Sequence, residues 1–394
     1  MRLLHTADWH LGRTLEGRDR LPEHEAFFDE LQEIVVAEKI DVILMAGDVF
    51  DSVNPPAAAE ALFYESLARL SDKGRRPIVV IAGNHDHPDR LAAARTIAEE
   101  QSISIVGYPL KTSLRINVPA SGDVLHVAAL PYPSESRLRV SLIEEGEAER
   151  LREAYDERIR TIFAELTRTF RPDEVNIAMS HLFVAGGAAS DSERPIEVGG
   201  AYTVRAASLP PAAQYTALGH LHRPQHVQQA PAPARYAGSP LAFSFSESGY
   251  AKSVTVIDVR PGKIDLITEI PLRSGKPLVR WQAKQGLPQV WQWIEEGKDA
   301  ACWIELELHL AHTPSLEDIH RLRKAHPGLV TIRPVFPEDE RTYTAGANRH
   351  VPIDELFTRF YVRQTGGAQP EERLVKLFLE LINEEEEEDR HAAD

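Results

Sequence analysis

Histidine, aspartate and asparagine side chains follow apolar runs at five places in this 394-residue sequence. Loops that follow buried parallel strands are where α/β proteins place their chemistry. A single histidine after a strand is usually a hydrogen-bonded loop residue, but coincidence does not explain five such places in one domain. We therefore expect one sheet edge to bring together Asp8 and His10, Asp48, Asn84 and His85, His181, and His220 and His222.

These residue types suit two divalent cations that share one carboxylate. Ions in two-metal sites lie about 3.5–4 Å apart, which one bridging carboxylate can span. Asp48 is the natural bridge, because Gly47 lets the chain turn sharply at the strand end. Nitrogen and oxygen ligands without thiolate suit Mn, Fe or Zn better than Ca or Mg. Such ions lower the pKa of a bound water and attract an anionic phosphate, so the pattern favours phosphoester hydrolysis.

The elements that position these residues alternate between strand and helix. Residues 2–7, 41–46 and 77–82 predict buried strands, and residues 22–39, 57–70 and 89–100 predict helices. Such alternation is typical of a mostly parallel layered sheet. Further strands are expected at residues 123–133, 174–179, 215–218, 235–246 and 253–259, with a mostly exposed helical region at 136–170.

The pattern of the chain changes from about Lys276. Strands at 277–283, 302–310 and 329–335 alternate with helices at 287–296 and 316–326, which predicts a small accessory α/β unit, and residues 337–350 read as a linker. Two amphipathic helices follow, one from Ile353 to Tyr361 and one from Leu374 to Ile382. By pattern alone, they either pack back on the protein or offer an apolar face to a partner.

Composition limits the class of protein. With 43% hydrophobic and 26% charged residues, the chain can bury a substantial core. The N-terminal residues do not form a signal peptide and no run reaches transmembrane length, so we expect a cytoplasmic protein without membrane contact. The one cysteine, Cys302, suits a reducing compartment. A formal charge of −16 argues against a protein that coats DNA, although metal ions supply local positive charge.

The motifs D-x-H, G-D, G-N-H-D, H and G-H-x-H occur in this order, and the chain thereby resembles the calcineurin-like metallophosphoesterases. The segments HTADWHLGR, AGDVFDSVNPP, VIAGNHD, ALGHLH and YAGSPLAFSFSE are similar to those of a narrower family. This is the SbcD family of nuclease subunits from bacterial SbcCD complexes, which are related to the nucleases of Mre–Rad repair complexes.

The resemblance implies a role for each motif residue. One metal would be held by Asp8, His10, Asp48 and His222, and the second by Asp48, Asn84, His181 and His220, with Mn²⁺ as the expected metal. His85 would protonate the leaving 3′ oxygen or steady the scissile phosphate, a role that its loop position allows. His87 matches no motif and is expected to be structural or exposed. Some archaeal and eukaryotic relatives have a phosphate-steering histidine near Asp51, so the resemblance does not carry that role to this chain.

The resemblance also implies an architecture. It predicts a layered metallophosphoesterase sandwich over residues 1–262, with helices flanking two mixed β-sheets. A small α/β capping domain would span 275–337, and a pair of C-terminal helices at 351–389 would dock an SbcC-type coiled-coil ATPase in a heterotetramer. The helices at 57–70 and 89–100 lie where this family forms its homodimer. Leu62, Phe63, Leu67 and Leu70 would form that dimer face or serve as core.

The leading hypothesis is a metal-dependent DNA nuclease subunit. It would be a double-strand 3′–5′ exonuclease and a single-strand or hairpin endonuclease in DNA repair, recombination and replication. ATP dependence would come from the partner, because the chain has no phosphate-binding G-x-x-x-x-G-K-[ST] loop. One alternative is a small-molecule or cyclic-nucleotide phosphodiesterase, although residues 263–394 exceed what a small substrate needs. Another is a non-catalytic scaffold for the ATPase, against which the complete ligand set argues.

Overall fold

The computed structural model describes residues 1–138, 148–193, 202–310, 312–336, 352–364 and 369–379. The chain forms two compact units, Met1–Leu278 and Val279–Asp394, and each is described by itself. The larger unit contains every candidate ligand. None of the described helices is long and apolar enough to span a bilayer.

The first sheet of the larger unit has the strand order β16 (Lys263–Pro271), β15 (Ser253–Arg260), β1 (Arg2–Thr6), β4 (Val42–Met45), β5 (Ile78–Ile81) and β6 (Ile103–Val106). Strands β1, β4, β5 and β6 are parallel, whereas β15 and β16 add an antiparallel edge. Every residue of β4 and β5 is buried, which explains their unbroken apolar runs. The carboxyl ends of β1, β4 and β5 therefore lie at one edge.

The second sheet has the strand order β13 (Gln225–His226), β14 (Ala234–Tyr236), β12 (Tyr215–Gly219), β9 (Val175–His181), β8 (Val124–Leu130) and β7 (Leu114–Asn117). Strands β14, β12, β9 and β8 are parallel, and β13 and β7 are antiparallel edges. Side chains such as Leu3, Val79 and Ile177 fill the space between the two sheets. The two sheets therefore share one apolar core.

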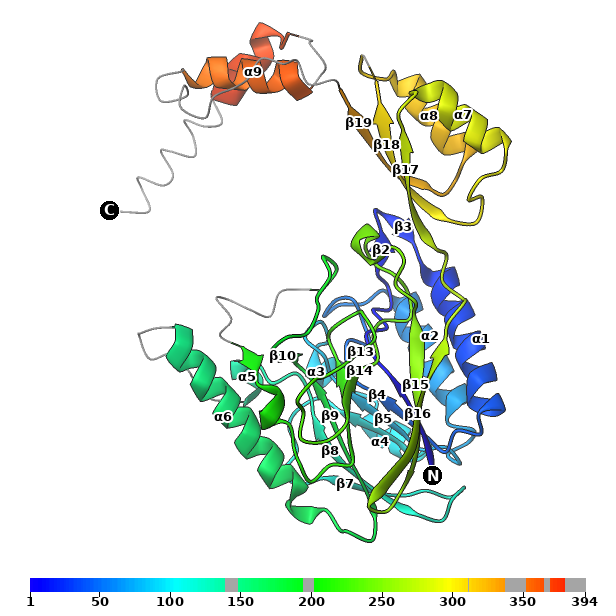
Figure 1. The fold of residues 1–394 in the computed structure, drawn as a ribbon, viewed down its shortest axis with the longest axis vertical. Helices are drawn as coiled ribbons and strands as arrows, with labels where there is room; N and C mark the ends of the chain where they lie inside the picture. Colours follow the sequence, from blue (N-terminus) through cyan, green and yellow to red (C-terminus); the bar gives the residue numbers. More distant parts are fainter. Residues whose placement is uncertain (139–147, 194–201, 311, 337–351, 365–368, 380–394) are drawn as a thin grey trace. The chain divides into compact units, whose positions relative to one another are not determined.

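Helices cover both outer faces of these sheets. On the side of the first sheet lie α1 (Leu21–Ala37) and α2 (Ala57–Leu70), with the short α3 (Pro88–Leu91) and α4 (Arg95–Glu99); α6 (Ala148–Leu166) covers the opposite side (Figure 1). Tyr155, Ile159 and Phe163 recur at intervals of four along α6 and are buried against the second sheet. The layers confirm the predicted α/β sandwich.

Two alternatives from the sequence are decided by burial. Phe63, Leu67 and Leu70 of α2 pack into the core beside the first sheet, so they are core residues and not a dimer face. Leu62 is half-buried at the edge of that core. The region expected to be a mostly exposed helix also has a buried face, formed by α6, while residues 139–147 lie outside the described residues.

Some predicted elements differ from those observed. Within the strand expected at 235–246, only β14 is a strand; a loop follows, and then a 3₁₀ turn, η3 (Phe245–Glu247). Gly238 has a φ of +79° and Pro240 lacks an amide hydrogen, so neither continues a strand. Strand β16 was not predicted and extends the first sheet beyond residue 262. The helix expected at 89–100 is divided into α3 and α4.

Short elements complete the larger unit. They are the strand pairs β2 (Thr14–Leu15) with β3 (Arg18–Asp19) and β10 (Phe183–Val184) with β11 (Thr203–Val204), the helix α5 (Glu135–Leu138), and the 3₁₀ turns η1 (Thr167–Thr169) and η2 (Ala206–Ser208).

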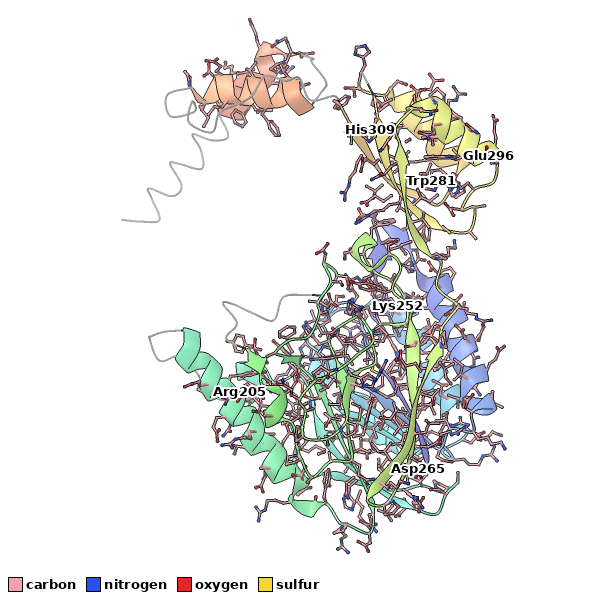
Figure 2. All side chains as sticks on the ribbon, in the orientation of Figure 1. Arg205, Lys252, Asp265, Trp281, Glu296 and His309 are labelled. Carbon is pink, nitrogen blue, oxygen red and sulfur yellow. The ribbon has the colours of Figure 1, made fainter. Side chains whose placement is uncertain are left out.

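The smaller unit has the predicted β-α-β-α-β order. It comprises β17 (Leu278–Ala283), α7 (Leu287–Glu295), β18 (Trp303–His309), α8 (Leu316–Ala325) and β19 (Leu329–Val335), with sheet order β17-β18-β19. Trp281, which Figure 2 labels, lies in its core with Val290 and Leu306. Two C-terminal helical segments, α9 (Ile353–Gln364) and residues 372–379, confirm the expected helices within the described residues, and their Phe357 and Phe378 rings stack at 4.0 Å. Residues 380–382 of the second expected helix and the linker expected at 337–350 lie outside the described residues. The domain limits and the capping role stay predictions.

Candidate metal centre

The five predicted positions meet where the two sheets approach each other, so the expectation of a single sheet edge is wrong: the strand ends come from two sheets. Asp8, Asp48 and Asn84 follow β1, β4 and β5 of the first sheet, whereas His181 ends β9 and His220 follows β12 of the second. The His181 Nε2 atom lies 2.8 Å from Oδ1 of Asn84. The backbone amide of His220 donates to Asp8 at 2.9 Å. Residues from opposite sheets therefore share one buried polar cluster.

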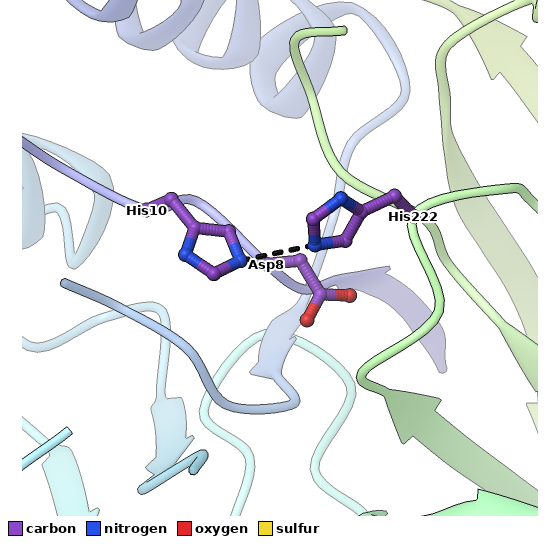
Figure 3. A group of neighbouring side chains, drawn as sticks. All are labelled: Asp8, His10 and His222. Atoms are coloured by element: carbon purple, nitrogen blue, oxygen red, sulfur yellow. Dashed lines mark hydrogen bonds between the residues drawn. The ribbon is translucent and has the colours of Figure 1, made fainter. Parts of the chain in front are cut away.

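His10 and His222 face each other across one part of this cluster (Figure 3). Their Nε2 atoms are 3.0 Å apart, and a carboxylate oxygen of Asp8 lies within 4.8 Å of both rings' donor atoms. The Nδ1 atom of His10 lies 3.4 Å from Oδ1 of Asp51. Two ligand atoms at right angles around an ion, each about 2.1 Å from it, are about 3 Å apart. The His10–His222 separation fits a shared metal ion.

Asp48 occupies the centre of the cluster. Its Oδ2 atom lies 3.5 Å from His10 Nε2, 3.4 Å from His181 Nε2 and 3.9 Å from His85 Nε2. Its Oδ1 accepts a hydrogen bond from the His85 backbone amide at 2.9 Å. One carboxylate oxygen is thus directed at imidazoles from both halves of the cluster, as a bridging ligand requires.

The orientation of His181 is set by the backbone. Its Nδ1 donates to the Ala46 carbonyl at 2.9 Å, so Nε2 is the ring atom that faces Asn84 and Asp48. The His220 ring lies 5.5 Å from the His181 ring, centroid to centroid. Among the described residues, His220 is outside the tight groups of potential ligand atoms, which are Asp8, His10 and His222; Asp8, Asp48 and His181; and His10, Asp51 and His85. His220 is therefore a neighbour of His181, but its ring nitrogens lie farther from the other potential ligand atoms than those of the other imidazoles do.

Burial controls ionisation in the cluster. It lowers the pKa of His10 to about 3 and that of His220 well below its usual value, so these imidazoles are neutral and have lone pairs for a metal.

Burial raises the pKa of the Asp8 carboxyl well above the usual range. Burial also opposes ionisation of Asp48, but His181, His10 and His85 together outweigh it and lower the pKa of Asp48. Burial likewise opposes the charge on His181, but Asp48 and Asp8 raise its pKa to about 9. Buried carboxylates of this kind need a compensating cation, and the donor set fits divalent metal ions.

Backbone strain is concentrated at the same residues. The φ angles of Asp8, His10, Asp48 and His220 are +55°, +47°, +53° and +106°. Such conformations each cost roughly 1–3 kcal/mol in non-glycine residues and cluster at functional sites.

Two glycines allow the strand ends to pack closely. A Cβ on Gly47, whose φ is +92°, would lie 2.4 Å from His181 Nδ1. A Cβ on Gly83 would lie 2.1 Å from Oδ1 of Asp48. The predicted sharp turn at Gly47 is confirmed, whereas Gly83 is needed for close approach and not for a positive φ.

His85 and His87 lie in different environments although they are two residues apart. His85 is buried, and its Nδ1 donates to the Asp51 carbonyl at 2.7 Å, so its Nε2 faces the cluster. His87 is exposed and caps α3, where its Nδ1 accepts from the Arg90 amide at 3.4 Å. The expectation that His87 is structural or exposed is confirmed.

Asp86 and Arg137 support the site but were not predicted. The Asp86 carboxylate accepts hydrogen bonds from the amides of Val49, Phe50 and Gly83, and so ties the loop after β4 to the loop after β5. Burial and the nearby Asp48 charge raise its pKa to about 6. Arg137 donates to the carbonyls of Gly83 and Asp86 at 2.7 and 2.6 Å. A carboxylate in the polar run after Asn84 was the available signal for Asp86; Arg137 had none.

Two family models match the chain. Residues 1–224 match the model of the calcineurin-like phosphoesterases, and residues 274–365 match that of the type 5 capsule protein repressor C-terminal domain. Among solved structures, that of the protein TT1561 from Thermus thermophilus covers 69% of this chain and 99% of that chain, with 13% identity and a TM-score of 0.37.

Two curated relatives have the same name, which designates the SbcD subunit of the nuclease SbcCD. The Bacillus subtilis protein is 58% identical over 389 residues, which is 99% of this chain and 100% of the relative. The Rhodobacter capsulatus protein is 37% identical over 302 residues, which is 73% of each chain. The chain therefore belongs to the calcineurin-like phosphoesterase family and, within it, to the SbcD family of SbcCD nuclease subunits.

Proposed function

We propose that this protein is a metal-dependent DNA nuclease subunit that hydrolyses phosphodiester bonds. The convergence of two buried carboxylates with imidazoles from both sheets carries this proposal. The Bacillus subtilis relative, a nuclease subunit by name, matches 99% of the chain, and the Rhodobacter capsulatus relative matches 73%; these matches do not favour a small-molecule phosphodiesterase or a silent scaffold.

The proposed ligands divide into two sets that share Asp48. Asp8, His10, Asp48 and His222 would hold one ion, and Asp48, Asn84, His181 and His220 would hold the other. The 3.0 Å separation of His10 and His222 and the 2.8 Å separation of His181 and Asn84 support this division. When bound, such ions, for which Mn²⁺ is the proposed identity, would activate a water for attack and would neutralise phosphate charge.

His85 is the proposed acid. The Asp51 carbonyl holds its Nδ1–H, so only Nε2 is available to a substrate. A protonated Nε2 donates to the leaving 3′ oxygen or to a phosphate oxygen. The ring is buried and packs against the His10 ring, with 4.7 Å between the centroids, and this contact fixes its position. His85 is not one of the proposed ligands.

The proposed substrate is DNA, cut as a double-strand 3′–5′ exonuclease and as a single-strand or hairpin endonuclease, in repair, recombination and replication. The names of the relatives support a nuclease. The half-buried free thiol of Cys302 supports a reducing compartment such as the cytoplasm.

The proposed partner is an SbcC-type coiled-coil ATPase, in a heterotetramer built on a homodimer of the nuclease domain. Large apolar side chains are exposed on the C-terminal helical segments, namely Ile353, Phe360, Leu374 and Leu377. They support a docking role for these helices. For the homodimer, Tyr64 of α2 and Ile97 of α4 are exposed and available, unlike Phe63, Leu67 and Leu70.

One experiment separates the possible functions. Purified protein with Mn²⁺ is given linear duplex DNA, a cyclic nucleotide and a chromogenic phosphodiester, each with and without a chelator. We expect chelator-sensitive DNA cleavage that the ATPase subunit increases. Cleavage of the cyclic nucleotide alone would support the small-molecule enzyme. An absence of all cleavage with the ATPase present would support the scaffold.

A further inference from the structure

The His222 side chain is held by a serine from a distant loop. The Ser192 Oγ atom lies 2.5 Å from Nδ1 of His222 and donates its own hydrogen to Oε1 of Glu247 at 2.6 Å. Because the serine hydrogen is used by Glu247, Ser192 accepts the Nδ1–H of His222. The lone pair of His222 is therefore on Nε2, the atom that faces His10.

Glu247 is fixed in turn by a buried lysine. The Lys252 ammonium contacts Oε2 of Glu247 and donates to Oγ of Ser239 at 2.8 Å and to the His222 carbonyl at 3.0 Å. Glu247 is 1% exposed and Lys252, which Figure 2 labels within the larger unit, is 8% exposed. All three hydrogens of the ammonium thus have acceptors, so the buried charge pair has little freedom to move.

The backbone of His222 is held by the same surroundings. Its amide donates to Oε1 of Glu193 at 2.8 Å, and its carbonyl accepts from Lys252. The ring packs edge-on against Phe243 at 5.6 Å between centroids. Contacts to the amide, the carbonyl and the ring together define one position for the His222 imidazole.

We propose that Ser192, Glu247 and Lys252 form a positioning network that fixes the tautomer and orientation of His222 and thereby sets the affinity of the metal ion held by His10 and His222. The inference rests on the proposed ligand role of His222. Outer partners of ligating histidines typically change metal affinity by about 10- to 100-fold. Because of this network, the affinity for the ion at His10 and His222 depends on side chains from the 190–193 loop and from η3.

The two metal sites differ in this respect. His181 is oriented by the Ala46 backbone carbonyl, which no side-chain substitution removes. His222 is oriented by a hydroxyl that a single substitution deletes. Changing Ser192 should therefore weaken the binding of one ion and leave the binding of the other unchanged.

Ser192→Ala is the test variant, and Ser192→Thr is the conservative variant that keeps the hydroxyl. Ser208→Ala is the matched control, because Ser208 is also buried and donates to a buried carboxylate, Asp156, at 2.9 Å, away from the cluster. His222→Asn tests the ligand role itself. Each full-length variant is titrated with Mn²⁺ by calorimetry and with Co²⁺ by visible absorption, and the metal-free proteins are compared by thermal unfolding.

We expect Ser192→Ala to weaken one of the two Mn²⁺ binding constants by about 10- to 100-fold and to alter the Co²⁺ spectrum. Without metal, its melting temperature should be close to that of Ser208→Ala. Ser192→Thr, which keeps the hydroxyl, should have the same Mn²⁺ binding constants as the parent protein. Unchanged constants in Ser192→Ala, or the same loss in Ser208→Ala, would overturn the network. If His222→Asn also leaves both Mn²⁺ constants unchanged, the proposed ligand role of His222 is wrong as well. If His222→Asn loses an ion but Ser192→Ala does not, His222 is a ligand and only the positioning network is wrong.

Discussion

The backbone amide of His85 donates a hydrogen bond to Oδ1 of Asp48 at 2.9 Å. The loop that presents the proposed acid therefore also holds the proposed bridging carboxylate. The same loop is tied to the one after β4 by Asp86. Because these contacts are shared, substitutions must be chosen to separate metal binding, acid catalysis and loop structure.

Asp48→Asn should abolish activity by removing the bridge. Loss of an outer partner alone costs about 10- to 100-fold in metal affinity, so loss of a ligand shared by both ions should cost more for each. Calorimetric titration with Mn²⁺ and a DNA cleavage assay measure the two effects. Asp258→Asn, on β15 and paired with Arg2, is the control and should retain both. Full Mn²⁺ binding by Asp48→Asn would contradict the bridging role.

His85→Ala should retain metal binding but lose turnover. Removing a general acid lowers the rate by about 10²–10⁴-fold, and the proposed ligand sets do not include His85. Single-turnover cleavage and Mn²⁺ titration on the same preparation measure both. His87→Ala, two residues away and exposed, should behave as the parent protein. Loss of metal from His85→Ala would show that this histidine is a ligand.

Asp86→Ala should destabilise the protein and reduce activity. It leaves buried amides of Val49, Phe50 and Gly83 without their acceptor, and an unsatisfied buried group costs about 1–3 kcal/mol. Urea denaturation measures the free energy of unfolding. Asp173→Ala, at an exposed position, should change it by less than about 0.5 kcal/mol. Equal stability of the two variants would mean that water replaces the carboxylate at no cost.

Gly83→Ala should disturb Asp48 directly. The added methyl group would lie 2.1 Å from the Asp48 carboxylate and 2.2 Å from its backbone nitrogen, so the two loops must separate. We expect weaker Mn²⁺ binding together with lower stability, measured by calorimetric titration and urea denaturation. Gly262→Ala meets no atom within 4 Å and should cost only the strain of its φ of +72°, about 1–2 kcal/mol, with unchanged metal binding.

Phe360→Glu and Leu377→Glu should impair docking of the ATPase subunit. Loss of a central apolar contact costs about 2 kcal/mol or more in binding, which is about 30-fold in the dissociation constant. Surface plasmon resonance measures the affinity, and Mn²⁺-dependent cleavage of a short single strand should be unchanged. Leu266→Glu places the same charge on an exposed leucine of β16 and should bind normally. Normal binding by both helix variants would argue against this docking surface.

The sequence by itself determined the ligand-bearing strand ends of the larger unit and the order of the elements around them. Buried parallel strands read as unbroken apolar runs, and their carboxyl ends must share an edge. The polar residues after β1, β4 and β5 were therefore predictable as neighbours. The β-α-β-α-β order of the smaller unit was also predictable, because its helical and strand periods alternate clearly. Pattern failed at residues 235–246, where Gly238 and Pro240 interrupt an apolar stretch.

Only the tertiary structure decided how the second sheet meets the first and what supports the cluster. The contact between His181 and Asn84 joins residues 97 positions apart, and that between Ser192 and Glu247 joins residues 55 apart. Period and propensity describe local structure, so they predict which strand ends carry polar residues but not which of those side chains touch. The positive φ of Asp8 has the same origin, since the packed surroundings impose a conformation that the local sequence disfavours.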